Sequence, residues 1–251
     1  MKISASNEFR ISPFARFYEP ITDSFINIKQ VSDSLKNHLT HSKKELFEIG
    51  LGTGYFATQF TKDGYRVKGI QPVDEMLSIL KLRNTDIEIM AECKLEDYQF
   101  TEKYETIVSH SSVFLFTEHE SQFGRHGEKL KSYIFQSFIT NEEMVLNCLH
   151  KTLQALMPHG RLFINIQTNP QSFITIETSE QLLTFEMAQC NYFLELGYVE
   201  KKFNLTFKGQ TFEVKDTRFC ETFTKFADQV QTFGFKATVS EDRYWVIIKR
   251  M

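Results

Sequence analysis

The stretch LFEIGLGTG, residues 46–54, contains the pattern that decides the fold. Its first four residues form a short apolar run around Glu48, which is typical of a buried strand, and glycines follow at positions 50, 52 and 54. A glycine-rich turn between a strand and a helix lets the backbone approach a ligand closely and directs free helix amides towards it. The stretch therefore predicts a ligand-binding loop, with the Glu48 carboxylate placed to accept hydrogen bonds from an ammonium group.

The segments after this loop alternate between strand and helix patterns. Expected strands cover residues 65–70, 87–89, 106–111 and 162–167, and expected helices pass through residues 56–60, 75–82 and 145–156. The third of these helices is predicted to begin at a capping box, T-N-E-E, from Thr140. Alternation of this kind implies crossover connections and a parallel sheet covered on both faces. We therefore expect an α/β fold, a doubly wound, Rossmann-like sheet of seven strands with mixed direction.

Two other segments depart from this alternation. From residue 181 to residue 216 the apolar residues recur with period two, which predicts an antiparallel lid inserted at residues 168–217. An amphipathic helix is expected over residues 219–233, and two final strands over residues 236–240 and 244–249. The first 40 residues, with apolar side chains at helical spacing between Phe25 and Leu39, are expected to form a leading helical segment that covers the site, and residues 41–251 the main domain.

Composition limits the classes of function. The formal net charge is −3 and the basic residues are scattered, so we expect no nucleic-acid partner. The four cysteines lie far apart without a CxxC pair, which argues against a zinc ribbon, and no metal site is expected. No stretch is long and apolar enough to cross a membrane, so we expect no membrane partner and a cytoplasmic location.

The spacing of the glycines separates two classes of nucleotide-binding loop. Dinucleotide-binding loops prefer GxGxxG, and this chain carries Tyr55 where the third glycine of that pattern would stand. An acidic residue for a ribose is also missing, because Gln71 follows the second expected strand. Both features count against a nicotinamide-dependent oxidoreductase.

The motif EIGLGTG at residues 48–54 resembles the E-x-G-x-G-x-G pattern of class I S-adenosylmethionine-dependent methyltransferases. Three further stretches resemble that family: GIQPVDEML (69–77), YETIVSHSSVF (104–114) and LMPHGRLF (156–163). The resemblance covers residues 46–249 apart from the insertion, and inserted antiparallel strands at this point are similar to those of small-molecule N-methyltransferases. It implies methyl transfer from S-adenosylmethionine to a nitrogen or oxygen of a small-molecule acceptor, with S-adenosylhomocysteine as product.

The resemblance also implies which residues bind the cofactor. Glu48 and the glycine loop would hold the methionine part, Ile70 and Met76 would enclose the adenine, and the end of the fourth strand would lie next to the sulfonium. Gln71 stands where the family has an acidic residue for the ribose, which removes a charge-assisted pair of hydrogen bonds. Glu92 is aligned with the carboxylate beside the adenine, with Lys94 as the alternative. The expected cofactor-binding residues are Glu48, Gly50, Leu51, Gly52, Thr53, Gly54, Gln71, Pro72, Met76, Glu92, Cys93, Ser109 and His110.

Two residues are candidates for handling the acceptor. His110 is expected at the end of a strand, where ligands of such sheets bind, although a structural histidine is an equal alternative. Tyr18 resembles the tyrosine that many small-molecule methyltransferases fold over the cofactor, although it could equally be a packing residue. Glu118, His119 and His126 are weaker candidates that read as solvated loop residues.

The predicted function is therefore methylation of a small, partly apolar acceptor by a monomer or homodimer. The rival from another class that the residues leave open is a catalytically silent or non-methylating protein that binds S-adenosylmethionine, because Gln71 is itself a departure from the family pattern.

Overall fold

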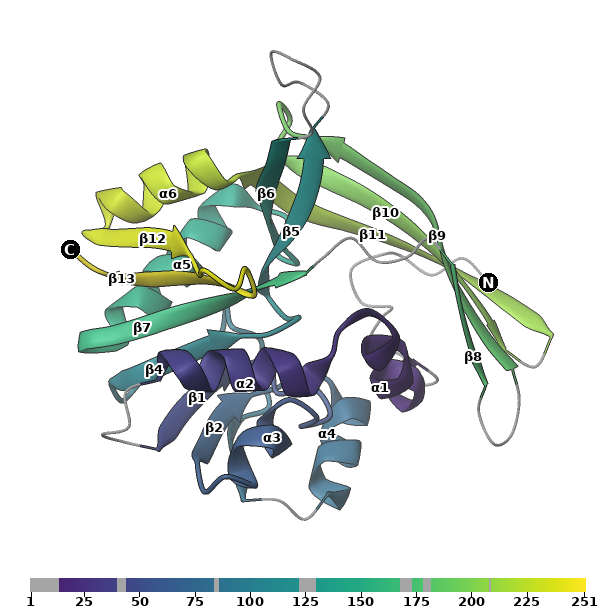
Figure 1. Cartoon of the computed structure of the whole chain (residues 1–251), viewed down its shortest axis with the longest axis horizontal. Coiled ribbons are helices and arrows are strands. Elements are labelled where there is room, and N and C mark those ends of the chain that lie inside the picture. Colours follow the sequence, from purple (N-terminus) through teal and green to yellow (C-terminus); the bar gives the residue numbers. More distant parts are fainter. Residues whose placement is uncertain are drawn as a thin grey trace.

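The computed structural model describes residues 14–39, 44–83, 86–121, 130–167, 173–177, 182–207 and 209–251. Within these ranges the strands join into one continuous 13-stranded sheet with two parts (Figure 1). The main sheet has the order β3-β2-β1-β4-β7-β13-β12. The lid sheet continues from β7 in the order β5-β6-β11-β10-β9-β8.

The main sheet has seven strands, as the sequence predicted. They are β1 (Glu45–Ile49), β2 (Arg66–Ile70), β3 (Ile87–Ala91), β4 (Tyr104–Ser109), β7 (Leu156–Gln167), β12 (Phe235–Val239) and β13 (Trp245–Arg250). The strands from β3 to β7 pair in parallel, and β13 runs antiparallel to both β7 and β12. The predicted doubly wound sheet of mixed direction is confirmed.

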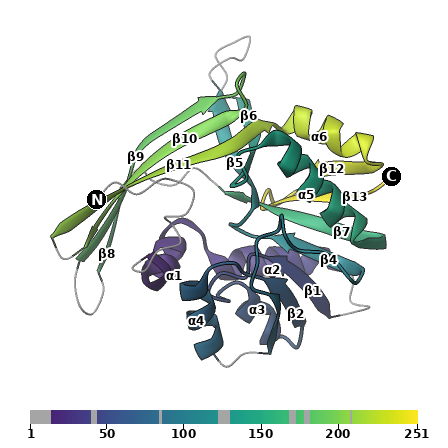
Figure 2. The ribbon, with the colours of Figure 1, turned by 180° about the vertical axis from the view of Figure 1, so that it is seen from behind.

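Helices cover both faces of the main sheet. They are α1 (Phe14–Phe25), α2 (Ile28–His38), α3 (Ala57–Thr61), α4 (Asp74–Leu82), α5 (Glu142–Gln154) and α6 (Phe223–Thr232). Successive residues of a strand face opposite sides, so Leu46 of β1 packs in the apolar cluster that includes α2 and α3, while Phe47 packs in the cluster that includes α5 and α6. Figure 1 shows α2 on the near face and Figure 2 shows α5 on the other.

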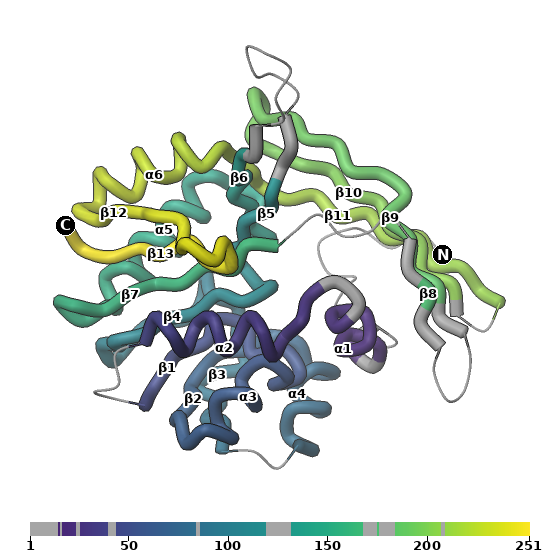
Figure 3. Tube along the Cα trace, in the orientation of Figure 1, coloured from purple at the N-terminus to yellow at the C-terminus, as the bar shows by residue number. Residues whose placement is uncertain are grey.

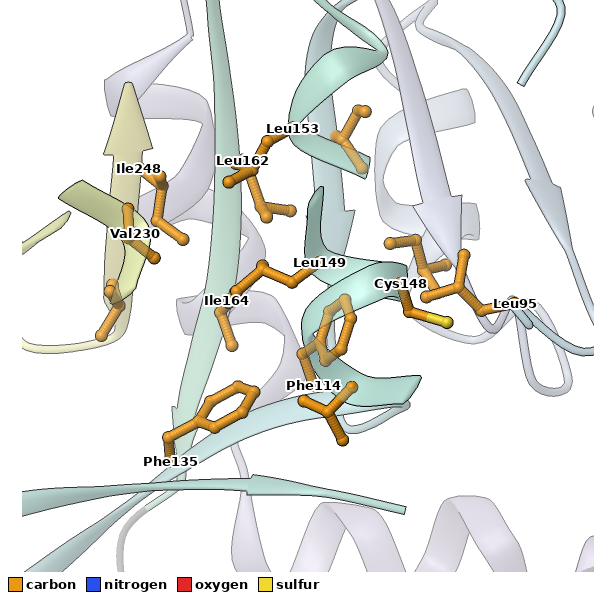
Figure 4. Packing of buried hydrophobic residues seen from close by; sticks show 14 of the residues in the cluster. Leu95, Phe114, Phe135, Cys148, Leu149, Leu153, Leu162, Ile164, Val230 and Ile248 are labelled. Atoms are coloured by element: carbon orange, nitrogen blue, oxygen red, sulfur yellow. The ribbon is translucent and has the colours of Figure 1, made fainter. Parts of the chain in front are cut away.

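The core beneath α5 is continuous with the base of the lid sheet. Figure 4 shows Leu149 and Leu153 of α5 against Leu162 and Ile164 of β7, with Phe135 close by. All five side chains are fully buried. Because Phe135 belongs to the lid sheet, this packing attaches the lid firmly to the main sheet.

The lid sheet is antiparallel and larger than the expected insertion. Its strands are β5 (Phe114–Ser121), β6 (Leu130–Ser137), β8 (Phe173–Glu177), β9 (Leu182–Phe193), β10 (Tyr198–Phe207) and β11 (Gln210–Thr222). It starts where β7 runs past its main-sheet neighbours and pairs in parallel with β5 through Phe116 and Ile166. The tube in Figure 3 shows the long strands β9, β10 and β11 extending away from this junction.

Three local expectations need correction. Helix α5 is capped by Asn141, whose side chain accepts a hydrogen bond from the backbone amide of Met144, whereas the sequence suggested a cap at Thr140. Helix α6 begins only after Thr222, because Phe219 belongs to β11 and pairs with Ser137. The connection before α5, read as a loop, contains the β5–β6 hairpin, because its apolar residues pair with the lid instead of facing solvent.

Helix α1 lies between the two sheets. It contacts both α4 of the main domain and β8 of the lid sheet, and Figure 1 shows it in this position. Its Phe17 and Ile21 are buried in a cluster with Phe185, Phe203 and Leu205 of the lid sheet. None of the described helices has the length and apolar character needed to span a membrane.

Candidate active site

The glycine loop follows β1 directly and is held by the neighbouring strand. The backbone amides of Gly50 and Leu51 both donate to the carbonyl of Ile70 at the end of β2, at 3.0 Å each. Gly54 closes the turn by donating to Leu51 at 2.8 Å. The loop is therefore fixed at the carboxyl ends of β1 and β2, where open α/β sheets bind their ligands.

Two of the glycines are required by their backbone conformation, and Gly50 also by the space around it. Gly50 and Gly52 have φ angles of +78° and +56°, which L side chains rarely adopt. A Cβ on Gly50 would lie 2.7 Å from the Cβ of Ser112, so a larger residue there would displace the turn after β4. A Cβ on Gly52 would point between Tyr18 and Met76, at 3.7 and 3.9 Å, and would fill part of the cavity that both line.

Glu48 carries a buried carboxyl group with one unsatisfied oxygen atom. Only 1% of the residue is exposed, and its Oε2 atom accepts no hydrogen bond from any of the described residues. Burial raises the pKa of this carboxyl well above its ordinary value. A buried polar atom without a partner is costly, so this carboxyl is poised to bind a donor that the protein itself does not supply.

His110 lies beside Glu48 in a small cavity of about 10 Å³. Its ring stacks on Phe56 with centroids 4.2 Å apart, and its Nε2 atom has no hydrogen-bond partner among the described residues. Burial lowers the pKa of the imidazole to about 3, so the ring is neutral at pH 7. The structure therefore brings His110 to the Glu48 end of the site and not to the lid.

Tyr18 joins this small cavity to a larger one, because it lines both. Burial, together with the nearby Glu48 carboxyl, raises the pKa of the Tyr18 phenol to about 12, so the hydroxyl remains protonated. Helix α1 is held over the loop by its own carboxylates. Glu19 accepts a hydrogen bond from Thr53 at 2.6 Å, and Asp23 accepts one from the Tyr55 hydroxyl at 2.7 Å.

The larger cavity has a volume of about 260 Å³ and extends from the glycine loop to the lid sheet. On the loop side, Gly50, Gly52, Gln71, Pro72 and Met76 line it. The lid residues that line it, which we call the acceptor wall, are Leu115, Thr117, Phe185, Met187, Cys190, Tyr192, Lys201, Phe203 and Arg218. One cavity thus connects the loop expected to bind a cofactor with a surface that can hold a second molecule.

Gln71 is buried at the end of β2 and lines the cavity. Its side-chain amide donates to the Met76 sulfur at 3.2 Å, and its backbone amide donates to Ala91. The side chain therefore lies at the cavity that the glycine loop also lines. An amide can donate one hydrogen bond and accept another from neighbouring hydroxyls.

Several expected cofactor-binding residues lie elsewhere. Glu92 is exposed and forms a surface ion pair with Lys81 of α4 at 2.6 Å, and Cys93 packs against the core beneath α5. The Ser109 hydroxyl donates to the carbonyl of Phe114 and supports the turn after β4. Glu92, Cys93 and Ser109, together with Thr53 and Gly54 of the loop, are not among the residues that line either cavity.

The weaker acceptor candidates do not meet at the site. Glu118 follows Thr117 on β5 and so points to the other face of the lid sheet from the acceptor wall. The side chain of His119 and all of His126 lie outside the described residues.

The sequence reading missed the acceptor wall, although a signal for it exists. In β10 the residues Val199, Lys201, Phe203 and Leu205 alternate on one face of the strand, and all four are buried. On β11, Arg218 pairs directly with Val199, so its side chain lies on the same buried face of the lid sheet. A charged residue in the buried phase of a strand is uncommon and points to a functional position.

A search with known family models identifies part of this chain. Residues 47–127, which include the glycine loop, match the model described as a methyltransferase domain. No curated protein sequence matches the chain.

Solved structures match over almost the whole chain. The CcbJ methyltransferase from Streptomyces caelestis aligns with a TM-score of 0.69 and 10% identity, covering 94% of this chain and 96% of its own. The amino pentose methyltransferase CalS10 from Micromonospora echinaspora, solved with S-adenosylmethionine bound, has a TM-score of 0.62 and 12% identity and covers 93% and 96%. The sugar N-methyltransferase KedS8 from Streptoalloteichus aligns with a TM-score of 0.62 and 10% identity. The alignment covers 100% of this chain and 98% of KedS8.

At such identities the structural matches establish the fold, and the family match adds the activity. The residues present fit a cofactor with an amino-acid end, because the buried Oε2 atom of Glu48 has no partner among the described residues and a Cβ on Gly52 would fill part of the cavity between Tyr18 and Met76. The methyltransferase assignment that the motif at residues 48–54 predicted agrees with the family match over residues 47–127. Residues 47–127 thus match a methyltransferase domain, and the whole chain has the fold of the solved S-adenosylmethionine-dependent methyltransferases.

Proposed function

We propose that this protein methylates a nitrogen or oxygen atom of a small, partly apolar acceptor that binds against the acceptor wall. The observation that carries the proposal is the single cavity of about 260 Å³, which runs from Gly50 and Gly52 to the lid sheet. Two structural neighbours are named as an amino pentose methyltransferase and a sugar N-methyltransferase, which favours nitrogen as the methylated atom.

The residues of the chain divide into two groups by role. Glu48 and the glycine loop would hold the amino-acid end of S-adenosylmethionine, and Gln71, Pro72 and Met76 would contact its nucleoside end. When bound, this cofactor supplies an electrophilic methyl group on sulfur. The reaction is an in-line displacement, so the protein's main tasks are to align the two partners and to exclude water.

Tyr18 would contribute to both tasks. It lies between the two cavities, and its phenol stays protonated because its pKa is raised to about 12. It can therefore donate a hydrogen bond but does not act as a base at neutral pH. Helix α1, which carries it, lies between the main domain and the lid sheet and covers the site there.

Calorimetric titration with S-adenosylmethionine, S-adenosylhomocysteine and NAD tests the cofactor part of this proposal. We expect heat with the first two compounds and none with NAD. Heat with NAD alone would overturn the assignment. The absence of heat with all three would also overturn it, because the catalytically silent alternative, which the Gln71 departure leaves open, would still bind S-adenosylmethionine.

The acceptor part needs a separate measurement. A panel of amino sugars and hydroxylated small molecules, assayed by release of S-adenosylhomocysteine and by mass spectrometry of the products, should reveal a gain of one methyl group on some members. If the protein binds S-adenosylmethionine but methylates proteins or nucleic acids instead of small molecules, the acceptor proposal fails.

A further inference from the structure

The charged residues on the cavity surface are all of one sign. Lys201 and Arg218 line the acceptor wall, and no aspartate or glutamate of the described chain lines this cavity. Both cations are buried, with 9% and 7% of their surface exposed. Buried charges are costly unless they are paired, so the partners of these two cations need to be identified.

Asp216 supplies one carboxylate for the two cations. It accepts a hydrogen bond from the Nε atom of Arg218 at 2.5 Å, and it stands opposite Lys201 in the ladder between β10 and β11. Asp216 is itself only 3% exposed and does not line the cavity. Among the described residues, one positive charge on the cavity surface is therefore left without a carboxylate of its own.

Further contacts hold this cationic surface in place. The Arg218 guanidinium lies over the ring of Phe138, 3.9 Å from its centroid. Near it, Gln136 donates to the Thr117 hydroxyl at 2.5 Å and to the Tyr192 hydroxyl at 3.3 Å. The side chains are thus oriented before any ligand arrives, which lowers the entropic cost of binding.

We propose that the methyl acceptor carries an anionic group, a carboxylate or a phosphate, which Lys201 and Arg218 bind at the acceptor wall. The apolar side chains beside them, Phe185, Met187 and Phe203, would contact the uncharged body of the acceptor. The role of this group in catalysis rests on the proposed function, whereas its binding can be measured independently.

The ionisation of Lys201 agrees with this assignment. Burial, and then the charge of Arg218, lower the pKa of the Lys201 ammonium to about 7. The groups that face it are Arg218, Asp216, Cys190 and Cys220. A bound anion would add a negative charge to this group and favour the protonated lysine.

Matched pairs of small probes test the inference on the whole protein. Benzoate and phenyl phosphate are compared with neutral benzamide by calorimetry, with and without S-adenosylhomocysteine. We expect at least one anion to bind about tenfold or more tightly than benzamide, because hydrogen bonds to charged groups are the stronger ones. The ratio of benzoate to phenyl phosphate distinguishes a carboxylate site from a phosphate site. Equal binding of benzamide and both anions would overturn the proposal.

Variants locate the preference on the acceptor wall. Lys201→Met should lose most of the preference for the anion, whereas Lys202→Met should keep it, because Lys202 faces the other way and pairs with Glu213 at 2.7 Å. Urea unfolding and S-adenosylhomocysteine affinity report whether each variant is intact, and Lys201→Gln serves as a second variant. An anion preference that survives both Lys201 changes would overturn the assignment.

The outcomes separate this inference from the proposed function. If wild-type protein fails to bind S-adenosylhomocysteine, the proposed function fails, and the comparison of benzoate with benzamide still decides the present inference. If the cofactor product binds normally and the anion preference is absent, only this inference fails.

Discussion

The two ends of the cavity bury ionisable groups of opposite sign. At the glycine-loop end, burial raises the pKa of the Glu48 carboxyl, and its Oε2 atom has no partner in the described part of the chain. At the lid end, burial lowers the pKa of the Lys201 ammonium to about 7, with Arg218 beside it. Burial disfavours the charged form in both places. Each end therefore gains most from a ligand of the opposite charge, a cationic amino-acid end at Glu48 and an anion at Lys201.

The two ends also differ in how the chain builds them. Glu48 and the glycine loop come from one continuous stretch, residues 48–54, that is held by hydrogen bonds to the end of β2. The cationic surface comes from β10 and β11, which pair through the register that places Lys201 opposite Asp216. A consecutive motif can be recognised along the chain, whereas a surface assembled from two strands depends on their pairing.

The largest expected effect is at the lid end, on stability. Arg218→Met should leave Asp216 buried without its partner and lower the free energy of unfolding by about 3–5 kcal/mol. The double variant Asp216→Asn with Arg218→Met should lose less, because it removes both members of the ion pair together. Urea unfolding of the two variants measures the difference. Equal losses would show that the pair is not energetically coupled.

The next largest effect is at the opposite end, on binding of the cofactor product. Glu48→Gln should weaken the affinity for S-adenosylhomocysteine by about 2–5 kcal/mol, because it removes one partner of a buried charge pair. Calorimetry measures this loss. Glu45→Gln, at the start of the same strand and away from both cavities, is the matched control and should bind like wild type. Unchanged affinity in the Glu48 variant would separate this carboxyl from the cofactor.

The comparison predicts opposite pH dependences for the two ligands. Glu48 must lose a proton to pair with an ammonium, so the affinity for S-adenosylhomocysteine should rise as pH increases above about 4.5 towards the raised pKa. Lys201 must hold a proton to bind an anion, so the affinity for benzoate should fall as pH rises through about 7. When binding is linked to one proton, the binding free energy changes by at most about 1.4 kcal/mol per pH unit, which is a tenfold change in affinity.

Calorimetry from pH 5 to pH 9 checks both slopes, and each has its own control. Glu48→Gln should flatten the curve for S-adenosylhomocysteine and leave the curve for benzoate. Lys201→Met should do the reverse. Slopes of the same sign in wild-type protein would contradict the assignment of opposite charges to the two ends.

The smallest expected effect is at Glu92. Both side chains of its ion pair with Lys81 are exposed to solvent. Such pairs contribute about 0–1 kcal/mol to the free energy of unfolding. Glu92→Gln should therefore change the midpoint of urea unfolding little and S-adenosylhomocysteine affinity by less than about twofold. A large loss of affinity would mean that Glu92 turns towards the nucleoside when the cofactor binds.

The sequence by itself determined the main domain and the loop end of the site. The apolar run, the glycine spacing and Glu48 lie within nine residues, and positive φ angles at Gly50 and Gly52 explain why glycine is needed there. Alternating periodicities of strands and helices were sufficient for the seven-stranded main sheet. These are local properties, because they depend on residues close together in the chain.

Tertiary structure alone decided the positions of Glu92 and the lid cations. Glu92 and Lys94 were equivalent in the sequence, and only the packing of α4 beside β3 brings Lys81 to Glu92. Lys201 and Arg218 are 17 residues apart, and their common face depends on the register between β10 and β11. Strand register is set by pairing over the whole sheet, so the end of the site that meets the acceptor could not be read from the chain alone.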